Sequence, residues 1–420
     1  MKNRVLYSTV ILVLLLTLEA STQIKIDTIS GPIINKIPIY ISDLSGIGQS
    51  DPRATEFIQV LKNDLKNAAL FDFISGSDVV SDINNISFQS FYEAGADFLV
   101  IGQYQKIGDN IRIAVRLFDV KEGRPIDGRT YEASASKVRE AAHRFGDIIM
   151  KQLTGINGFF TNKIALILGS GRNRNLFIMD YDGFNLIQLT RHGALVLSPH
   201  CSRDGKNIIF NSDNVWDQDL YVITLGSKIR EKRLTKAFRL DQSAEWSPSG
   251  RKIAYSSKGD IYIANPDGSG AVNVTKNYAI DVSPTWSPDG SKIAFVSDKT
   301  GSPQLYVMNT NGSGVKRLTH GGYATDPSWS PNSSINKIAF VRVETGGANI
   351  YTINPDGSEE QRLTSSSRRN ENPSWSPDGH YIAFSSNRSG PKEIYMMYLN
   401  GGNQVKLSKG GGKSFPTWCK

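Results

Sequence analysis

The stretch Pro284-Thr-Trp-Ser-Pro-Asp-Gly290, with the apolar run Lys292 to Val296 behind it, decides the fold of this chain. The unit continues through Leu305-Tyr-Val-Met-Asn309 and closes at Arg317-Leu-Thr319. It recurs around Trp246, Trp329, Trp375 and Trp418, so that successive tryptophans lie 40 to 46 residues apart. A repeat of that length, with four short apolar segments in each unit, predicts the blades of a β-propeller.

Each unit predicts four antiparallel strands. The Trp lies on the first strand, and Ser-Pro-Asp-Gly then favours a type I turn because Pro presets φ and Gly accepts a left-handed conformation. The second strand, such as Ile293 to Phe295, is continuously apolar, as expected where neighbouring blades cover both faces. A third strand such as Leu305-Tyr-Val leads through a second turn to a fourth strand that ends in Leu-Thr.

The closing phrase predicts six blades and a closed ring. Leu-Thr or a near variant occurs at Leu189-Thr190, Leu234-Thr235, Val274-Thr275, Leu318-Thr319, Leu363-Thr364 and Leu407-Ser408. The last unit contributes only the Trp strand, Phe415 to Lys420, whereas Lys163 to Thr190 contribute three strands without a Trp. We therefore expect one blade to be assembled from both ends of the array, which leaves no unpaired edge strand.

A separate α/β domain is expected before the ring, over residues 22–156, with the propeller over 157–420. Ser50-Asp-Pro52 predicts a helix start, and Phe57, Leu61 and Leu65 follow at helical spacing. Strands are expected at Asp97 to Ile101 and, alternating in polarity, at Ile111 to Leu117; a second helix beginning near Val138 should end at Gly155.

Residues 1–21 predict a secretory signal peptide. Lys2 and Arg4 precede an almost wholly apolar run, Val5 to Leu18, which is too short for a typical membrane span. An uncleaved anchor is the alternative. For an exported chain, a formal charge of +8 is better explained by a solvated surface or by a binding site for an acidic partner than by nucleic-acid binding.

The two cysteines of the chain do not define a metal site. Cys201 takes the Trp position of its unit, and Cys419 follows Trp418 in a unit expected to be its neighbour. We expect two buried thiols, with a disulfide between inner strands as the alternative in an oxidising compartment.

The sequence argues against an enzyme. The fragments Gly268-Ser-Gly270 and Gly312-Ser-Gly314 fall in turns and lack the context of a nucleophile elbow. His192, His200, His320 and His380 occupy different positions in their units, so we do not expect them to converge as metal ligands. Asp213, Asp217 and Asp219 lack the glycine and the terminal Glu of a calcium loop. No cofactor and no metal are expected.

Taken together, several motifs resemble those of the TolB family, the periplasmic component of the Tol-Pal system. They are Leu153-Thr-Gly-Ile-Asn-Gly158 before Lys163-Ile-Ala, the Asp180-Tyr-Asp-Gly183 turn, the Trp-Ser-Pro-Asp-Gly units and the final Phe-Pro-Thr-Trp. The resemblance implies a monomeric scaffold that binds the lipoprotein Pal at the propeller mouth, binds TolA through the mature N-terminal segment, and can be exploited by toxins or meet other outer-membrane proteins. A lyase or hydrolase acting at the pore is the alternative.

The residues expected to meet Pal lead into the Trp strands, where they should surround the pore. They are Leu240, Asp241, Ser243, Asp281, Val282, Thr325, Asp326, Asn370, Asn372, Lys413 and Ser414. The alternative is that Asp and Asn there only cap turns. The segment expected to bind TolA as an added strand comprises Thr22, Gln23, Ile24, Lys25, Ile26, Asp27 and Thr28. The alternative for it is a permanent strand of its own domain, and we expect the segment to switch between these two states.

Overall fold

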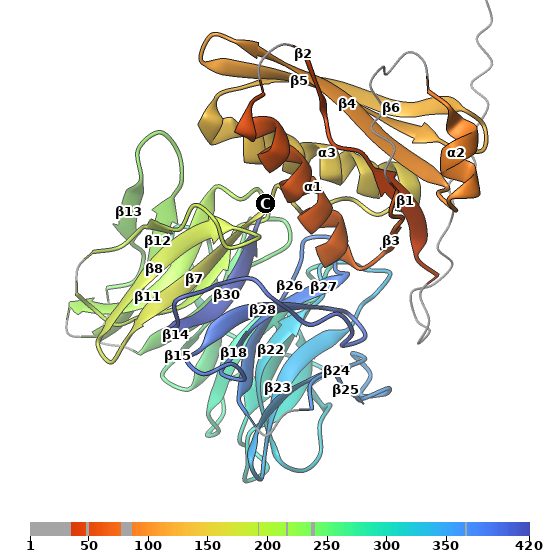
Figure 1. The fold of residues 1–420 in the computed structure, drawn as a ribbon. Helices are drawn as coiled ribbons and strands as arrows, with labels where there is room; N and C mark the ends of the chain where they lie inside the picture. The colour runs from red at the N-terminus through yellow and green to blue at the C-terminus, as the bar shows by residue number, and fades with distance from the viewer. Residues whose placement is uncertain are drawn as a thin grey trace, which may run out of the picture.

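The computed structural model describes residues 35–47, 50–76, 86–191, 193–215, 217–236, 240–365 and 368–420. An α/β domain lies against one face of a six-bladed β-propeller (Figure 1). The expected signal peptide and the segment 22–28 lie outside the described residues, as does His192. Among the helices of the described part, none is long and apolar enough to cross a bilayer.

The N-terminal domain is a mixed sheet backed by two long helices. Its strands run in the order β3-β1-β4-β5-β6, with β2 beside β4; β1 pairs in parallel with β3 and β4, and β4 to β6 are antiparallel. The elements are β1 (Ile37–Ile41), β2 (Ser45–Ile47), α1 (Pro52–Ala68), β3 (Phe71–Phe73), α2 (Phe88–Glu93), β4 (Phe98–Ile107), β5 (Asn110–Asp119), β6 (Arg124–Ala133), the 3-10 helix η1 (Ala135–Lys137) and α3 (Val138–Thr154).

The ends of the two long helices follow from local chemistry, as the sequence predicted. The Asp51 side chain accepts a hydrogen bond from the Arg53 backbone N–H at 3.0 Å and caps α1, with Pro52 in the first position. Gly155, at φ 73°, ends α3 in the left-handed conformation that costs glycine little. The apolar stripes of both helices pack into one core with the sheet.

The six blades have the predicted four strands each. Blade 1 is β10 (Val196–Cys201), β11 (Asn207–Val215), β12 (Asp217–Thr224) and β13 (Arg230–Arg233); blade 2 is β14 (Asp241–Trp246), β15 (Ile253–Ser257), β16 (Asp260–Ala264) and β17 (Val272–Asn273); blade 3 is β18 (Asp281–Trp286), β19 (Lys292–Ser297), β20 (Gln304–Asn309) and β21 (Lys316–Arg317). Blade 4 is β22 (Tyr323–Trp329), β23 (Ile338–Glu344), β24 (Gly347–Ile353) and β25 (Gln361–Arg362); blade 5 is β26 (Asn370–Trp375), β27 (Tyr381–Ser386), β28 (Glu393–Tyr398) and β29 (Val405–Lys406).

Blade 6 confirms that the ring is closed by strands from both ends of the array. Its order is β30 (Lys413–Cys419), β7 (Lys163–Ser170), β8 (Asn173–Asp180) and β9 (Ile187–Gln188). β30 pairs antiparallel with β7, so that Trp418 lies opposite Ile164. The same strand also contacts β10 of blade 1, which completes the ring.

A disulfide joins Cys201 of β10 to Cys419 of β30, and the expectation of two free thiols was wrong. The Cα atoms are 5.3 Å apart, and both side chains are buried where blades 1 and 6 meet. Cys201 occupies the position where the other blades place a Trp against their neighbour, which brings its sulfur to the strand that closes the ring. The bond therefore fastens the C-terminal strand to the first complete blade.

The N-terminal domain packs on the face of the ring that carries the Ser-Pro-Asp-Gly turns. Antiparallel strands put those turns, which we call the turn face, opposite the starts of the first strands, which we call the mouth face. The contacting residues Tyr181, Tyr381, Trp418 and Asn403 all lie at the turn face. Figure 1 shows α1 and α3 between the sheet and the propeller.

An aromatic cluster and a buried carboxyl hold the two domains together. Phe159 packs edge to face against Tyr181 and Trp418 and at a tilt against Tyr381, with ring centroids 4.4 to 5.7 Å apart. Asp64 of α1, fully buried, accepts hydrogen bonds from the Tyr181 hydroxyl at 2.6 Å and from His143 of α3 at 2.8 Å. Burial, opposed by the hydrogen bond from His143, raises the pKa of Asp64 to about 6.

The propeller also completes the C-terminus of α1. The last carbonyls of a helix have no partner within it. Here the Tyr381 hydroxyl donates to the Ala68 carbonyl at 3.0 Å, and the Asn403 amide donates to the Asn67 carbonyl at 2.8 Å. The helix end and the blade turns are therefore positioned by each other.

Breaking the Cys201–Cys419 bond should lower stability substantially. The bridge spans 218 residues of sequence, and the chain-entropy model assigns about 5 kcal/mol to a loop of that length as an upper value. We expect reductant to lower the urea unfolding midpoint of the wild-type protein and to leave a Cys201→Ala/Cys419→Ala variant unchanged. Equal midpoints for the wild type with and without reductant would contradict the assignment.

Candidate functional site

The first strand of every blade carries a β-bulge at the same place. The pairing register of each first strand with the second shifts after its second or third residue, for example between Val282 and Thr285 in blade 3. At each shift one non-glycine residue adopts a left-handed backbone, with φ between 48° and 55°. These six residues, which we call the left-handed ring, are Ser198, Ser243, Ser283, Asp326, Asn372 and Phe415.

The chemistry of the first strands explains the bulges. A first strand has no partner on its pore side, so a Pro, which lacks a backbone donor, is tolerated there and discourages pairing with another chain. Pro follows the left-handed residue in five of the six blades, at Pro199, Pro284, Pro327, Pro373 and Pro416. Asp and Asn tolerate the left-handed region better than most residues, whereas for bulky Phe415 it is strained.

A second ring of side chains, two residues further along each first strand, links neighbouring blades. The backbone N–H of Trp286 donates to Glu245 Oε1 at 3.1 Å, and that of Trp329 donates to Thr285 Oγ1 at 3.0 Å. Longer bonds at 3.4 Å run from the Trp246 N–H to His200 Nδ1 and from the Trp418 N–H to Ser374 Oγ. Each of these side chains accepts from the next blade, so the ring fixes the angle between blades.

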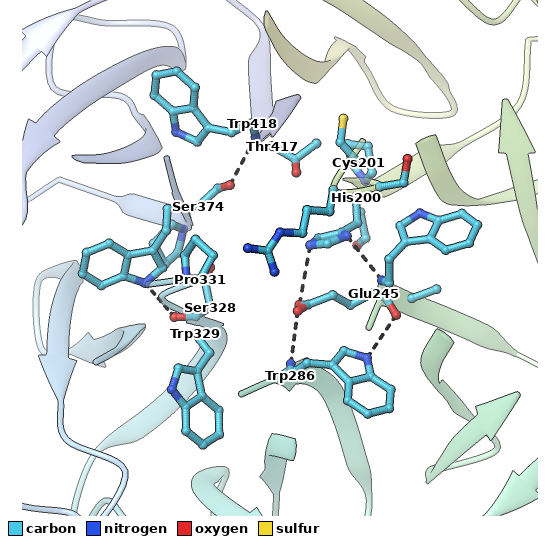
Figure 2. Close-up of a pocket in the computed structure, with 18 of the residues that line it drawn as sticks. His200, Cys201, Glu245, Trp286, Ser328, Trp329, Pro331, Ser374, Thr417 and Trp418 are labelled. Atoms are coloured by element: carbon cyan, nitrogen blue, oxygen red, sulfur yellow. Dashed lines mark hydrogen bonds and ion pairs between the residues drawn. The ribbon is translucent and has the colours of Figure 1, made fainter. Parts of the chain in front are cut away.

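Apart from the buried Thr285, the residues of the two rings line a central cavity of about 420 Å³. Figure 2 shows His200, Glu245, Ser328, Ser374 and Thr417 directed toward its centre, while the rings of Trp286, Trp329 and Trp418 point outward between blades. The left-handed ring borders the mouth end, and Asn157, Arg203 and Lys420 line the end toward the N-terminal domain. The wall is mainly short polar side chains and prolines.

His200 and Glu245 are the titratable pair of this cavity, with Nε2 and Oε2 3.8 Å apart. Both side chains are largely buried and border the cavity. Loss of solvation on burial is the largest cause of the pKa shift of each group. It raises the pKa of the Glu245 carboxyl to about 8 and lowers the pKa of His200 to about 4. Both are therefore neutral near pH 7, and each already accepts a hydrogen bond from a backbone N–H.

A carboxylate–amide bridge joins the left-handed ring between blades 4 and 5. Asn372 donates to Asp326 Oδ2 at 3.0 Å and accepts from Ser385 Oγ at 3.0 Å. Burial, followed by the nearby charge of Glu371, raises the pKa of Asp326 to about 6. Glu371 is bound by Lys392 and Arg369, both at 2.5 Å.

The structure places the residues predicted to meet Pal in three groups. Ser243, Asp326 and Asn372 line the cavity at its mouth end. Leu240 is exposed, and Val282, Thr325 and Ser414 are partly exposed on the mouth face. Asp241, Asp281, Asn370 and Lys413 are buried; Asp281 accepts from Asn277 Nδ2 at 2.6 Å, and Asn370 accepts from Ser386 Oγ at 2.8 Å. In blades 2, 3, 5 and 6 the position that opens the first strand is thus a structural one, whereas β22 of blade 4 opens with the exposed Tyr323.

Sequence reasoning missed His200 and Glu245 as cavity residues. The histidines were assigned to unrelated positions, but His200 directly precedes Cys201 as Glu245 precedes Trp246. The usable signal was alternation: the residue before the Trp points to the opposite side of the strand from the Trp, and so toward the pore and the next blade.

Among the residues that the structure describes, one group of side chains has the composition of a metal site, at the domain interface. Asp64, His143 and Asp182 can bring ligand atoms within 4.8 Å of one another. Tyr181 and His143 already occupy the oxygens of Asp64, and Arg139 pairs with Asp182. The group is therefore explained by contacts between the two domains.

The pKa of Glu245 predicts a pH-dependent stability. The native state holds a proton that the unfolded chain releases near its ordinary pKa of 4.5, so stability is lost as the pH rises from there to about 8. Glu245→Gln keeps the acceptor for Trp286 and removes the titration. We expect it to exceed the wild type in unfolding free energy by up to about 4 kcal/mol at pH 8 and to match it near pH 4.5. A difference that is constant with pH would contradict this.

Comparisons with known proteins agree with this architecture. The family model for the TolB beta propeller domain matches residues 150–418, and that for the TolB amino-terminal domain matches residues 25–126. The Tol-Pal system protein TolB of Desulfotalea psychrophila is 31% identical over 232 residues, which cover 55% of this chain and 52% of that protein. Its counterpart in Desulfosudis oleivorans is 32% identical over 281 residues, 63% of each chain.

The chain thus spans about half to two thirds of the length of these curated relatives. The crystal structure of TolB from Acinetobacter baumannii superposes with a TM-score of 0.78 at 24% identity, covering 91% of this chain and 96% of that one. That likeness supports the fold of both domains. The family match over the whole propeller shows that this chain belongs to the TolB family.

Proposed function

We propose that this chain is a non-enzymatic periplasmic scaffold of the Tol-Pal system. In this proposal it binds the lipoprotein Pal over the mouth of the propeller and TolA through residues 22–28. It thereby supports outer-membrane integrity and constriction at cell division. It acts as a monomer without a cofactor, and residues 1–21 direct its export.

One observation carries the proposal for Pal: the contacts with the N-terminal domain gather at the turn face, and the mouth face is left to the loops between blades. The left-handed ring at that end is held by bulges, prolines and bonds between blades. A partner loop that enters there meets a surface with little conformational entropy left to lose, which favours affinity. The rigidity of the left-handed ring therefore favours binding of a partner at the mouth.

The titratable groups of the cavity also support a non-enzymatic function. A general acid or base at the pore would have to come from His200, Glu245 or Asp326, which line the cavity and have shifted pKa values. His200 and Glu245 accept hydrogen bonds from the backbone of the next blade, and Asp326 accepts from the Asn372 amide of the next blade. These structural roles account for the three residues without a reaction. A pore-based lyase or hydrolase remains the competing function, and it would require at least one of them.

Narrowing the mouth end of the pore should weaken Pal binding. Ser243→Asn with Ser283→Asn adds bulk at two ring positions, and Asn tolerates the left-handed backbone found there. We expect the dissociation constant for lipid-anchor-free Pal, measured by calorimetry, to rise about tenfold, which corresponds to about 1.4 kcal/mol. Ser269→Asn, in an exposed turn of the opposite face, serves as the control.

Two results would count against the proposal. Unchanged affinity in the ring variant would place any Pal contact elsewhere on the chain. Turnover of a saccharide or peptide by the wild type that disappears in His200→Gln and Glu245→Gln would instead support the enzyme.

The TolA part of the proposal can be tested separately. Deleting residues 22–28 from the mature chain should abolish co-purification with the periplasmic domain of TolA, because an added strand contributes most of its affinity through its own backbone. Pal affinity should change by less than about twofold, and a scrambled segment of the same composition is the control. Retained TolA binding after the deletion would refute the assignment.

A further inference from the structure

Large apolar side chains are exposed together at one sector of the mouth face. Leu240 leads into β14, Tyr278 and Ile280 lead into β18, and Tyr323 begins β22; each is at least 54% exposed. They belong to consecutive blades, 2 to 4. Side chains of this size in one neighbourhood of a surface mark a site of association more often than isolated exposed residues do.

Exposed lysines occupy the same sector. Lys258 lies in the turn between β15 and β16, Lys276 in the loop before β18, and Lys299 in the turn between β19 and β20. Lys299 rests on the Tyr306 ring at 3.9 Å. Within the described part of the chain, none of the three forms an ion pair with a carboxylate.

The carboxylates of the same loops are turned inward. Asp298 is partly buried and accepts from the Ile280 N–H at 2.8 Å. Asp260 accepts from Asn273 and Thr275 at 2.9 and 3.0 Å, and buried Asp281 accepts from Asn277. The side chains of the three lysines are exposed whereas the three aspartates are partly or fully buried, so the charges that a partner meets first at this sector are positive.

Backbone hydrogen bonds make these loops one surface. The Asp281 N–H donates to the Gly259 carbonyl at 2.8 Å, next to Lys258. The Asp298 N–H donates to the Ile280 carbonyl at 3.4 Å, next to Lys299. We call Leu240, Lys258, Lys276, Tyr278, Ile280, Lys299 and Tyr323 the rim patch.

We propose that the rim patch binds an acidic protein segment that also carries apolar side chains. The inference rests on the proposed function, in which the partner at the mouth is Pal, and it specifies the chemistry of the partner's contacting surface. The lysines steer the acidic segment to the mouth and raise the association rate. Tyr278 and Ile280 bury against the apolar side chains and slow dissociation.

Two pairs of variants test the two halves of the patch. Lys258→Gln/Lys276→Gln should lower the association rate of lipid-anchor-free Pal about fivefold at about 50 mM salt, and the difference should shrink toward zero at about 0.5 M because salt screens the charges. Its control is Lys206→Gln/Arg251→Gln, at exposed cations of the turn face.

Tyr278→Ser/Ile280→Ser should raise the dissociation rate about tenfold. Its control is Val272→Ser/Val315→Ser, away from the mouth at exposed apolar residues.

The outcomes separate the inference from the proposed function. If Pal binds the wild type and both rim variants with the same rates, the inference is overturned and the scaffold function stands. If Pal does not bind the wild type, the proposed function fails and the rim patch loses its partner with it. If the lysine variant loses binding to vesicles of anionic phospholipid but keeps its Pal kinetics, the patch is a lipid site and the inference is wrong. Matching circular dichroism spectra establish that each variant is folded.

Discussion

The pairing of β30 with β7 is the contact on which the rest of this structure depends. An open array of four-stranded blades would leave the first and last blades each with an uncovered face and an unpaired edge. Once the C-terminal strand completes the sixth blade, every second and third strand is buried between neighbours. This is why Ile293, Ile338 and Ile382 are fully buried. The disulfide from Cys419 to Cys201 adds a covalent restraint at the same seam.

Closure also accounts for the properties of the pore. Six first strands converge on one axis, and each relieves the crowding by a bulge that places a non-glycine residue in the left-handed region. Such conformations cost on the order of 1 kcal/mol or more each and persist only where the surroundings determine them. Here the surroundings are the bonds from each blade to the next, including those accepted by Glu245 and Thr285. The left-handed backbones, the burial of the pore side chains and their shifted pKa values all follow from the convergence of the six first strands on one axis.

The two faces of the ring differ in the contacts that they make. At the turn face the N-terminal domain is held by Phe159, by the buried Asp64 and by the capping of α1, all of which tie its helices to blades 5 and 6. The rim patch on blades 2 to 4 and the left-handed ring, to which all six blades contribute, lie at the mouth face. Under the proposed scaffold function, this separation would let a partner occupy the mouth face without obstructing the contacts at the turn face.

Much of this architecture could be read from the sequence, because the signals are local. The period of the Trp units, the six Leu-Thr phrases, the Asp51-Pro52 helix start and the Gly155 helix end each act within a few residues, and all were confirmed. The sequence by itself therefore determined the blade number, the closure and the helix limits. Only the tertiary structure decided that Asp281 and Asn370 are buried, that His200 and Glu245 face each other, and that Cys201 meets Cys419. Those outcomes depend on which side of a bulged strand faces the next blade. For His200, Glu245 and Cys201 that is set by contacts between residues at least 41 positions apart in the chain.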